Sequence, residues 1–207
     1  MKITKYEHAC LDIVEQGTRI LIDPGKFTKV LTDFSNISCV IVTHVHSDHF
    51  EPSNLTKIYQ QNPNLKIFTV SQVANEISNL PTTIVKAEDK FTINNLSLEF
   101  FGGKHELYED FENIAVLVNE KLFHPGDSYT LPNKTIKVLA TPASAPWLRV
   151  KDAGQFIINC KPKIAFPIHN ILLSEEGKEI HYRILNNICQ ENEVSWLPLE
   201  VGESLEI

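Results

Sequence analysis

The start of the chain alternates apolar runs with turn signals. Residues 9–15 alternate apolar and polar side chains, Gln16-Gly17 marks a turn, and residues 19–23 form a second strand that ends at Asp-Pro-Gly. The run 39–42 is short, uncharged and rich in β-branched residues, which is typical of a strand buried on both faces. A helical stretch at 55–61 follows a cap-like Glu-Pro-Ser-Asn segment and ends at Asn-Pro-Asn. These signals predict a hairpin, then a buried strand, then a helix.

The remainder of the chain continues this succession of strands and helices. A strand-like run at 66–70 precedes a helix at 71–80, for which Ser71 is the expected cap. The order of strands, βαβα, further strands and a second βαβα predicts an α/β fold in which two mixed β-sheets are flanked by helices. The later elements that we expect are strands at 83–85, 90–93, 96–101, 114–118, 121–123, 135–140 and 163–166, and helices at 149–159 and 174–189.

Length and composition suit a soluble globular protein, and we expect residues 1–207 to form one domain. The formal net charge of −7 argues against nucleic acid or an anionic membrane as the main partner. No signal-peptide core and no apolar run of bilayer-spanning length is present, so we expect no membrane partner. The cysteines form no CxxC pair, which suits reduced thiols and a cytoplasmic location; they are Cys10, Cys39, Cys160 and Cys189.

Polar residues of metal-ligand type follow the buried strand at 39–42 directly. His44, His46, Asp48 and His49 lie within six positions, in an HxHxDH string. Polar side chains at the end of a buried strand cost free energy unless a partner compensates them, and a bound metal ion is the usual partner. The string therefore predicts a metal site.

Three later residues occupy comparable positions after strand-like runs. His105 follows a strand and two glycines, Asp127 follows a strand and a Pro-Gly turn, and His169 closes the strand-like run that begins at 163. A set of imidazoles and carboxylates without a thiolate pattern suits zinc, manganese or iron. We expect these residues to join the HxHxDH string at one site.

The chain resembles the metallo-β-lactamase-fold hydrolases, whose five ordered motifs run here from Asp23 to His169. The strings around these motifs are most similar to a small bacterial branch related to the ascorbate-6-phosphate lactonase group. The resemblance implies a four-layer αββα sandwich. The strings that carry it are His8-Ala9-Cys10, Leu21-Ile22-Asp23-Pro24-Gly25, His124-Pro125-Gly126-Asp127-Ser128 and Lys163-Ile164-Ala165-Phe166-Pro167-Ile168-His169.

The resemblance also implies a binuclear centre with a metal-bridging hydroxide that cleaves a small ester, lactone or phosphodiester. Two divalent ions are implied, with zinc as the first expectation and manganese or iron as alternatives. Asp48 and Asp127 are the implied catalytic residues, and Asp23 would orient ligands from behind them. The implied ligand sets are His44, His46 and His105 for one ion, Asp48, His49 and His169 for the other, and Asp127 as the bridge between both.

Four further residues have weaker claims on the site. His8 could reach the site mouth from the first hairpin. Trp147 and Arg149 could shape a substrate pocket and bind an anionic group, or they could be a Trp packed under a loop and a surface Arg. For His124 we expect structural hydrogen bonding, with a role in the pocket as the alternative.

Several alternative functions remain beside the hydrolase. One is a metal-binding module without catalysis, and another is a thioester- or persulfide-processing relative of the same fold. A di-iron redox enzyme fits less well, because such relatives typically carry Glu at the position of His46 together with a flavin domain. A nuclease also fits poorly, because the net charge is negative. We expect a small-molecule substrate, whose identity the sequence leaves open together with the oligomeric state.

Overall fold

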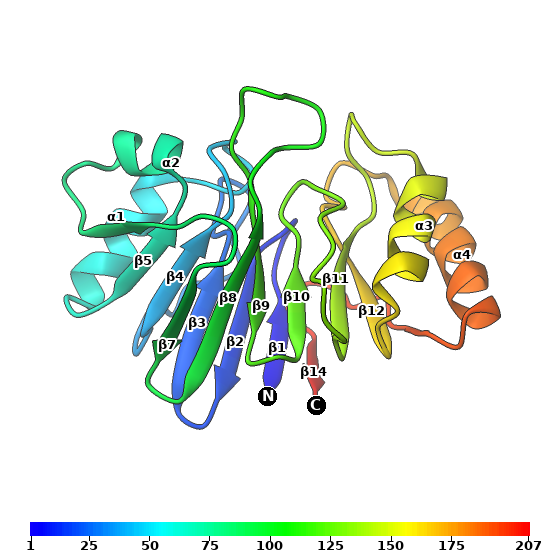
Figure 1. The fold of residues 1–207 in the computed structure, drawn as a ribbon, viewed down its shortest axis with the longest axis horizontal. Helices are drawn as coiled ribbons and strands as arrows, with labels where there is room; N and C mark the ends of the chain where they lie inside the picture. The colour runs from blue at the N-terminus through cyan, green and yellow to red at the C-terminus, as the bar shows by residue number, and fades with distance from the viewer.

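The computed structural model describes residues 1–207 and consists of two seven-stranded mixed sheets packed face to face between pairs of helices (Figure 1). The first sheet has the order β14-β1-β2-β3-β4-β5-β6, in which β3 to β6 run parallel. Its elements, with the two helices on its outer face, are β1 Lys2–Lys5, β2 Leu11–Glu15, β3 Thr18–Ile22, β4 Cys39–Val42, α1 Pro52–Gln61, β5 Lys66–Thr69, α2 Ser71–Glu76, β6 Thr82–Ile84 and β14 Ser204–Glu206.

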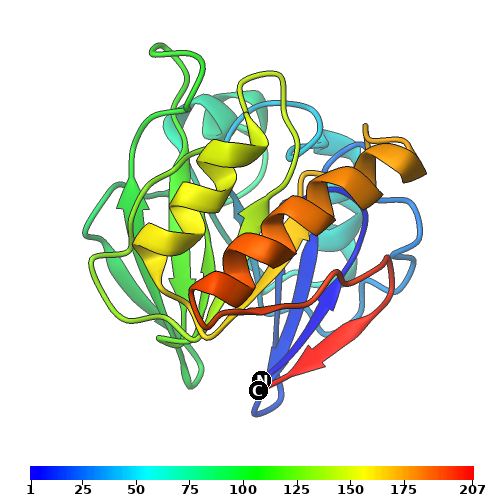
Figure 2. The ribbon, with the colours of Figure 1, turned by 90° about the vertical axis from the view of Figure 1, so that its right-hand side faces the viewer.

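The second sheet has the order β13-β12-β11-β10-β9-β8-β7, with parallel pairing from β10 to β13 and antiparallel pairing elsewhere. Helices α3 and α4 lie side by side across its outer face (Figure 2). The elements are β7 Lys90–Ile93, β8 Leu96–Gly102, β9 Ile114–Val118, β10 Leu122–His124, β11 Val138–Pro142, α3 Val150–Cys160, β12 Ile164–Ile168, α4 Glu175–Glu191 and β13 Ser195–Trp196. The expected αββα sandwich is confirmed.

Two apolar cores hold these layers together. The larger core fills the space between the sheets, extends under α1 and α2, and includes Leu55 and Val73 of those helices. The smaller core lies between the second sheet and the outer helix pair, where Phe156 of α3 and Leu185 of α4 are buried. Complete burial of a side chain such as Phe156 contributes about 2–3 kcal/mol to stability. The sheets therefore form a rigid frame for the loops at their ends.

The structure differs from the sequence prediction in a few elements. Helix α2 ends at Glu76, and its cap is Val70 rather than Ser71, because the Ser71 hydroxyl donates to Glu112 instead of capping the helix. The sequence did not predict strands β1, β13 and β14; β14 pairs with β1 and is the edge strand of the first sheet. The last helix begins close to the predicted position, and Ser174 caps it by accepting a hydrogen bond from Gly177 N.

The strands that precede the predicted metal ligands end at one edge of the sandwich. Strands β4, β8, β10 and β12 all point to this edge, and the long loop after β8 projects beyond it (Figure 1). Both chain termini lie at the opposite edge (Figure 1). None of the helices combines the length and apolar character that crossing a bilayer requires.

Candidate metal centre

The loop after β4 is anchored by Asp23, which follows the neighbouring strand β3. Asp23 is fully buried and accepts hydrogen bonds from the Thr43 backbone N–H and the Thr43 hydroxyl, both at 2.8 Å. Its Oδ2 also lies 2.7 Å from His49 Nδ1. The carboxylate holds a proton on Nδ1 of His49, so that Nε2 is the nitrogen that faces the centre of the site.

The turn after Asp23 supports the same loop by close backbone packing. Lys26 N donates to Ser47 O, and Gly25 packs directly against the backbone of Asp48 and His49. A Cβ atom on Gly25 would lie 2.0 Å from the Asp48 carbonyl oxygen. Only glycine allows this approach, so the Asp-Pro-Gly string is needed to place the HxHxDH loop.

The loop that carries Asp127 is held by the side chain of Asn113, whose role was not predicted from the sequence. The Asp127 N–H donates to Asn113 Oδ1 at 2.9 Å, and Asn113 Nδ2 donates to Pro125 O at 2.9 Å. Gly126 has a φ of 60° and lies so close to Asn113 that a Cβ atom would be 2.3 Å from Oδ1. An Asn directly before an entirely apolar strand was the available signal for this role.

One group of possible ligands consists of His44, His46, His105 and Asp127. Their ligand atoms all lie within 4.8 Å of one another. His105 Nε2 is 3.3 Å and His44 Nε2 is 3.9 Å from Asp127 Oδ2. The two imidazoles from the HxHxDH loop thus meet side chains from the second sheet, as the strand-end positions predict.

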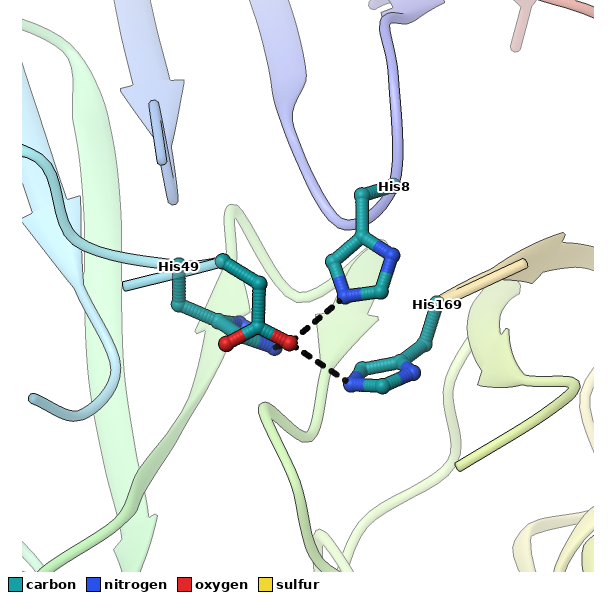
Figure 3. Close-up of side chains that lie close together, drawn as sticks. His8, His49 and His169 are labelled. Carbon is teal, nitrogen blue, oxygen red and sulfur yellow. Dashed lines mark hydrogen bonds and ion pairs between the residues drawn. The ribbon is translucent and has the colours of Figure 1, made fainter. Parts of the chain in front are cut away.

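The second group consists of His8, Asp48, His49 and His169, whose ligand atoms also lie within 4.8 Å of one another. His8, His49 and His169 come from three separate segments and point toward one another (Figure 3). Asp48 Oδ2 is 3.0 Å from His8 Nε2 and 3.4 Å from His169 Nε2. His8 is buried and lies inside the site, whereas the sequence placed it at the mouth of the site.

Asp127 lies between the two groups. Its Oδ1 is 3.1 Å from His49 Nε2, and its Oδ2 is 3.2 Å from His169 Nε2 and 3.3 Å from His105 Nε2. The side chain is almost fully buried. One carboxylate thus contacts histidines of both groups.

The donor atoms fit bound cations. The Nε2 atoms of four histidines and Oδ1 of Asp127 are buried and have no hydrogen-bond partner, although several lie close to a carboxylate oxygen. A buried polar atom without a partner costs about 1–3 kcal/mol, and a cation would satisfy all of these atoms at once. Ligands at about 2.1 Å from a metal are separated by about 3.0–3.4 Å in octahedral or tetrahedral arrangements. The contacts of Asp127 with His49, His169 and His105 fall in this range, whereas that with His44 is longer at 3.9 Å. The four histidines are His44, His49, His105 and His169.

The carboxylates and imidazoles of the site shift one another's pKa values. Burial alone would raise the pKa of Asp127, but the charges of His49 and His169 hold it well below its ordinary value. Burial would lower the pKa of His169, but Asp127 raises it to about 9. Burial, together with the charge of His49, lowers the pKa of His44 far below its usual range. The carboxylates thus favour positive charge at the site, whereas burial keeps imidazoles such as His44 neutral. Metals bind the neutral form of imidazole.

Of the three remaining residues proposed from the sequence, only Trp147 contacts a ligand residue. The Trp147 indole N–H donates to Asp127 Oδ2, so Trp147 contacts the site itself. Arg149 pairs with Asp152 and its side chain is 82% exposed, so the structure does not bring it to the histidines. His124 is fully buried; its Nδ1 accepts from Gly126 N and its Nε2 contacts Ala9 O, which is the expected structural role.

Aromatic side chains surround the more open side of the site. The ring of His46, which is only partly buried, lies 4.8 Å from that of Phe111 and 5.9 Å from that of Tyr108. Both aromatic residues belong to the loop after β8, which projects above the sheets (Figure 1). This loop forms an apolar wall beside His46.

The profile of the beta-lactamase superfamily domain matches residues 2–169. Solved structures with the same fold include Igni18, described as a novel metallo hydrolase from the hyperthermophilic archaeon Ignicoccus hospitalis. It superposes with a TM-score of 0.79 at 16% identity and covers 100% of this chain and 98% of its own. The chain belongs to the metallo-β-lactamase-fold superfamily of metal-dependent hydrolases.

Two curated proteins are similar to this chain in sequence. Protein Rv0786c of Mycobacterium tuberculosis is 31% identical over 192 residues, which cover 88% of this chain and 90% of the relative. The UPF0173 metal-dependent hydrolase NEQ378 of Nanoarchaeum equitans is 26% identical over 133 residues, which cover 64% of this chain and 52% of the relative. The superfamily membership and the sheet arrangement agree with the resemblance drawn from the HxHxDH string.

Proposed function

We propose that this chain is a binuclear hydrolase that cleaves a small ester, lactone or phosphodiester. The observation that carries the proposal is the position of Asp127, whose two oxygens approach histidines of both ligand groups. In the proposed arrangement His44, His46 and His105 would hold one ion, and Asp48, His49 and His169 would hold the other. Asp127 would be a ligand in both groups.

Two divalent ions in these groups would supply a water of lowered pKa and polarise a substrate carbonyl or phosphoryl oxygen. The residues of the chain hold this arrangement in place. Asp23 orients His49 through Nδ1, and Ser144 O accepts from His169 Nδ1. Asp48, the less buried of the two central carboxylates, would orient the attacking water.

The donor set supports hydrolysis rather than oxygen or nitric oxide reduction. His46 stands where redox relatives of the fold typically carry a glutamate, and imidazole-rich sites of this kind suit zinc. Manganese and iron are the alternatives, because nitrogen and carboxylate donors accept several first-row ions.

The test combines metal analysis with a substrate panel. Purified protein, dialysed free of loose metal, should contain about two equivalents of metal per chain. It should hydrolyse at least one member of a panel of p-nitrophenyl esters, lactones and bis-p-nitrophenyl phosphate. A chelator should abolish turnover, and one added metal should restore it.

Asp127→Ala should lose both metal and turnover, whereas Asp152→Ala, at the exposed pair with Arg149, should lose neither. An Asp127→Ala protein with full metal content and full activity would contradict this role of Asp127. Two equivalents of metal without turnover on any ester, lactone, thioester or phosphodiester would instead favour a metal-binding module.

A further inference from the structure

His8 differs from the other histidines of its group in the direction of its ring. Its Nε2 lies 3.0 Å from Asp48 Oδ2 and meets the geometry of a hydrogen bond. His169 Nε2 lies 3.4 Å from the same oxygen and 3.2 Å from Asp127 Oδ2, yet it does not meet the geometry of a hydrogen bond with either. The His8 nitrogen is therefore aimed at the carboxylate oxygen, whereas the His169 nitrogen is aimed past it into the centre of the site.

The other imidazoles behave like His169. The Nε2 atoms of His44, His49 and His105 are buried and unpartnered, as expected for atoms that face a cation. In His8 it is Nδ1, on the far side of the ring, that lacks a partner. If Nε2 bound a metal, the proton would move to Nδ1 and would be buried without an acceptor, which is unfavourable.

The backbone around His8 is held in place by other residues of the site. His8 has a φ of 62°, in the left-handed region that costs a non-glycine residue free energy. Its carbonyl accepts a hydrogen bond from His169 N, and the carbonyl of the next residue, Ala9, contacts His124 Nε2. Two segments of the second sheet thus hold a loop of the first sheet, and this loop presents the His8 ring to Asp48.

We propose that His8 is a positioning residue that donates its Nε2–H to Asp48 and is not itself a metal ligand. The hydrogen bond fixes the orientation of the Asp48 carboxylate, so that Asp48 can hold the second ion and orient the attacking water. His8 acts through Asp48, with a proton on Nε2. This inference rests on the proposed binuclear function.

The test compares His8→Gln with His8→Ala. The glutamine amide nitrogen can occupy the position of Nε2 and donate to Asp48, but it is a poor ligand for zinc. His8→Ala should weaken the affinity for the second metal equivalent by about 10- to 100-fold, the usual effect of removing a residue that orients a ligand. His8→Gln should keep the second equivalent within a few-fold of the unmodified chain. Chelator competition followed by elemental analysis measures both.

The first metal equivalent serves as an internal standard, because the contacts of His44, His46 and His105 do not involve His8. His181→Gln is the matched control, because the His181 ring is also held by one hydrogen bond, to the Ala143 carbonyl, but lies outside both ligand groups. It should leave both affinities unchanged. Thermal unfolding of the metal-free variants verifies that each one is folded, and His8→Gln alone carries the test if His8→Ala does not fold.

If folded His8→Gln and His8→Ala both lost affinity for the second metal ion to the same extent, the proposal would be overturned and His8 would be a ligand. An unchanged affinity in His8→Ala would also overturn it, because Asp48 would then need no support. These outcomes require an unmodified chain that holds two equivalents. If the unmodified chain does not hold two, it is the proposed binuclear function that fails.

Discussion

The indole N–H of Trp147 donates a hydrogen bond to Asp127 Oδ2 at 3.1 Å. Trp147 lies in the loop between β11 and α3, and its ring is steeply inclined to those of His105 and His169, with centroids 6.1 and 6.5 Å apart. Trp147, which the sequence offers as a residue of the substrate pocket, thus contacts the carboxylate that lies between the two ligand groups.

Trp147→Phe should lower kcat by about 10-fold and weaken metal binding modestly, because it removes the donor that orients Asp127 and keeps an aromatic ring. Steady-state kinetics on the substrate identified by the panel measures the effect. Trp196→Phe is the control, because Trp196 is buried in the outer core and its indole nitrogen has no partner. Equal activity in Trp147→Phe and the unmodified chain would show that Asp127 does not depend on this bond.

Asp23→Asn should weaken metal binding by about 10- to 100-fold. The Asp23 carboxylate accepts from Thr43 and from His49, and an asparagine would turn its NH₂ group toward one of these donors. The unmatched donors should also lower the free energy of unfolding of the metal-free protein by about 1–3 kcal/mol. Chelator competition and urea unfolding measure the two effects. Asp33→Asn, an exposed partner of Arg19, should change neither.

Gly25→Ala should reduce metal affinity as well as stability. The new Cβ would collide with the Asp48 carbonyl at 2.0 Å, and because both partners are backbone, the HxHxDH loop must move. Gly17→Ala is the contrasting variant: Gly17 has a φ of 78° and no atom within 4 Å of a Cβ. It should lose about 1 kcal/mol through backbone strain and keep its metal content. A Gly25→Ala protein with normal metal affinity would contradict the role given to this close contact.

Lys5→Met should stabilise the protein at pH 7. Lys5 is 1% exposed, and its one hydrogen bond is to Tyr6 O at 3.3 Å. Burial lowers the pKa of Lys5 from 10.5 to about 8, so between these values the unfolded chain binds more protons than the folded one. Stability of the unmodified chain should therefore rise with pH across this window, and the cost of burying the charge is fully present below it.

Lys5→Met should raise the free energy of unfolding by on the order of 3 kcal/mol at pH 7, and this increase should shrink toward pH 10.5. Urea unfolding of the metal-free proteins at pH 7 and pH 10 measures it. Lys2→Met, on the exposed side of the same strand, is the control. A gain that did not depend on pH would reflect improved apolar packing rather than removal of a buried charge.

The residues that follow buried strands could be predicted to meet, because β4, β8, β10 and β12 end at the same edge of the sandwich (Figure 1). His44, His105 and His169 are of this kind. The contribution of His8 could not be predicted in the same way, since it depends on a left-handed turn and on contacts across the two sheets. Asn113 was missed because its side chain serves backbone groups 12 and 14 positions away.

Short edge elements were also difficult to predict. Strand β1 consists of Lys2–Lys5, in which alternating polar residues resemble an exposed terminus, and its partner β14 lies some two hundred positions away. The pairing of Arg149 with Asp152 was also not predicted. It arises because α3 begins directly after Arg149 and places Asp152, three positions later, beside it. Pairings between distant or exposed segments leave little trace in local periodicity.

The backbone bond from His169 N to His8 O joins the two sheets at the site, and each ligand group combines side chains from both sheets. Bound ions would therefore fasten the two halves of the sandwich to each other at that edge. An ion present at a hundred times its dissociation constant adds about 2.7 kcal/mol to the stability of the folded state. The amount of intact protein in a cell would then follow metal supply, and scarcity would reduce its abundance as well as its activity.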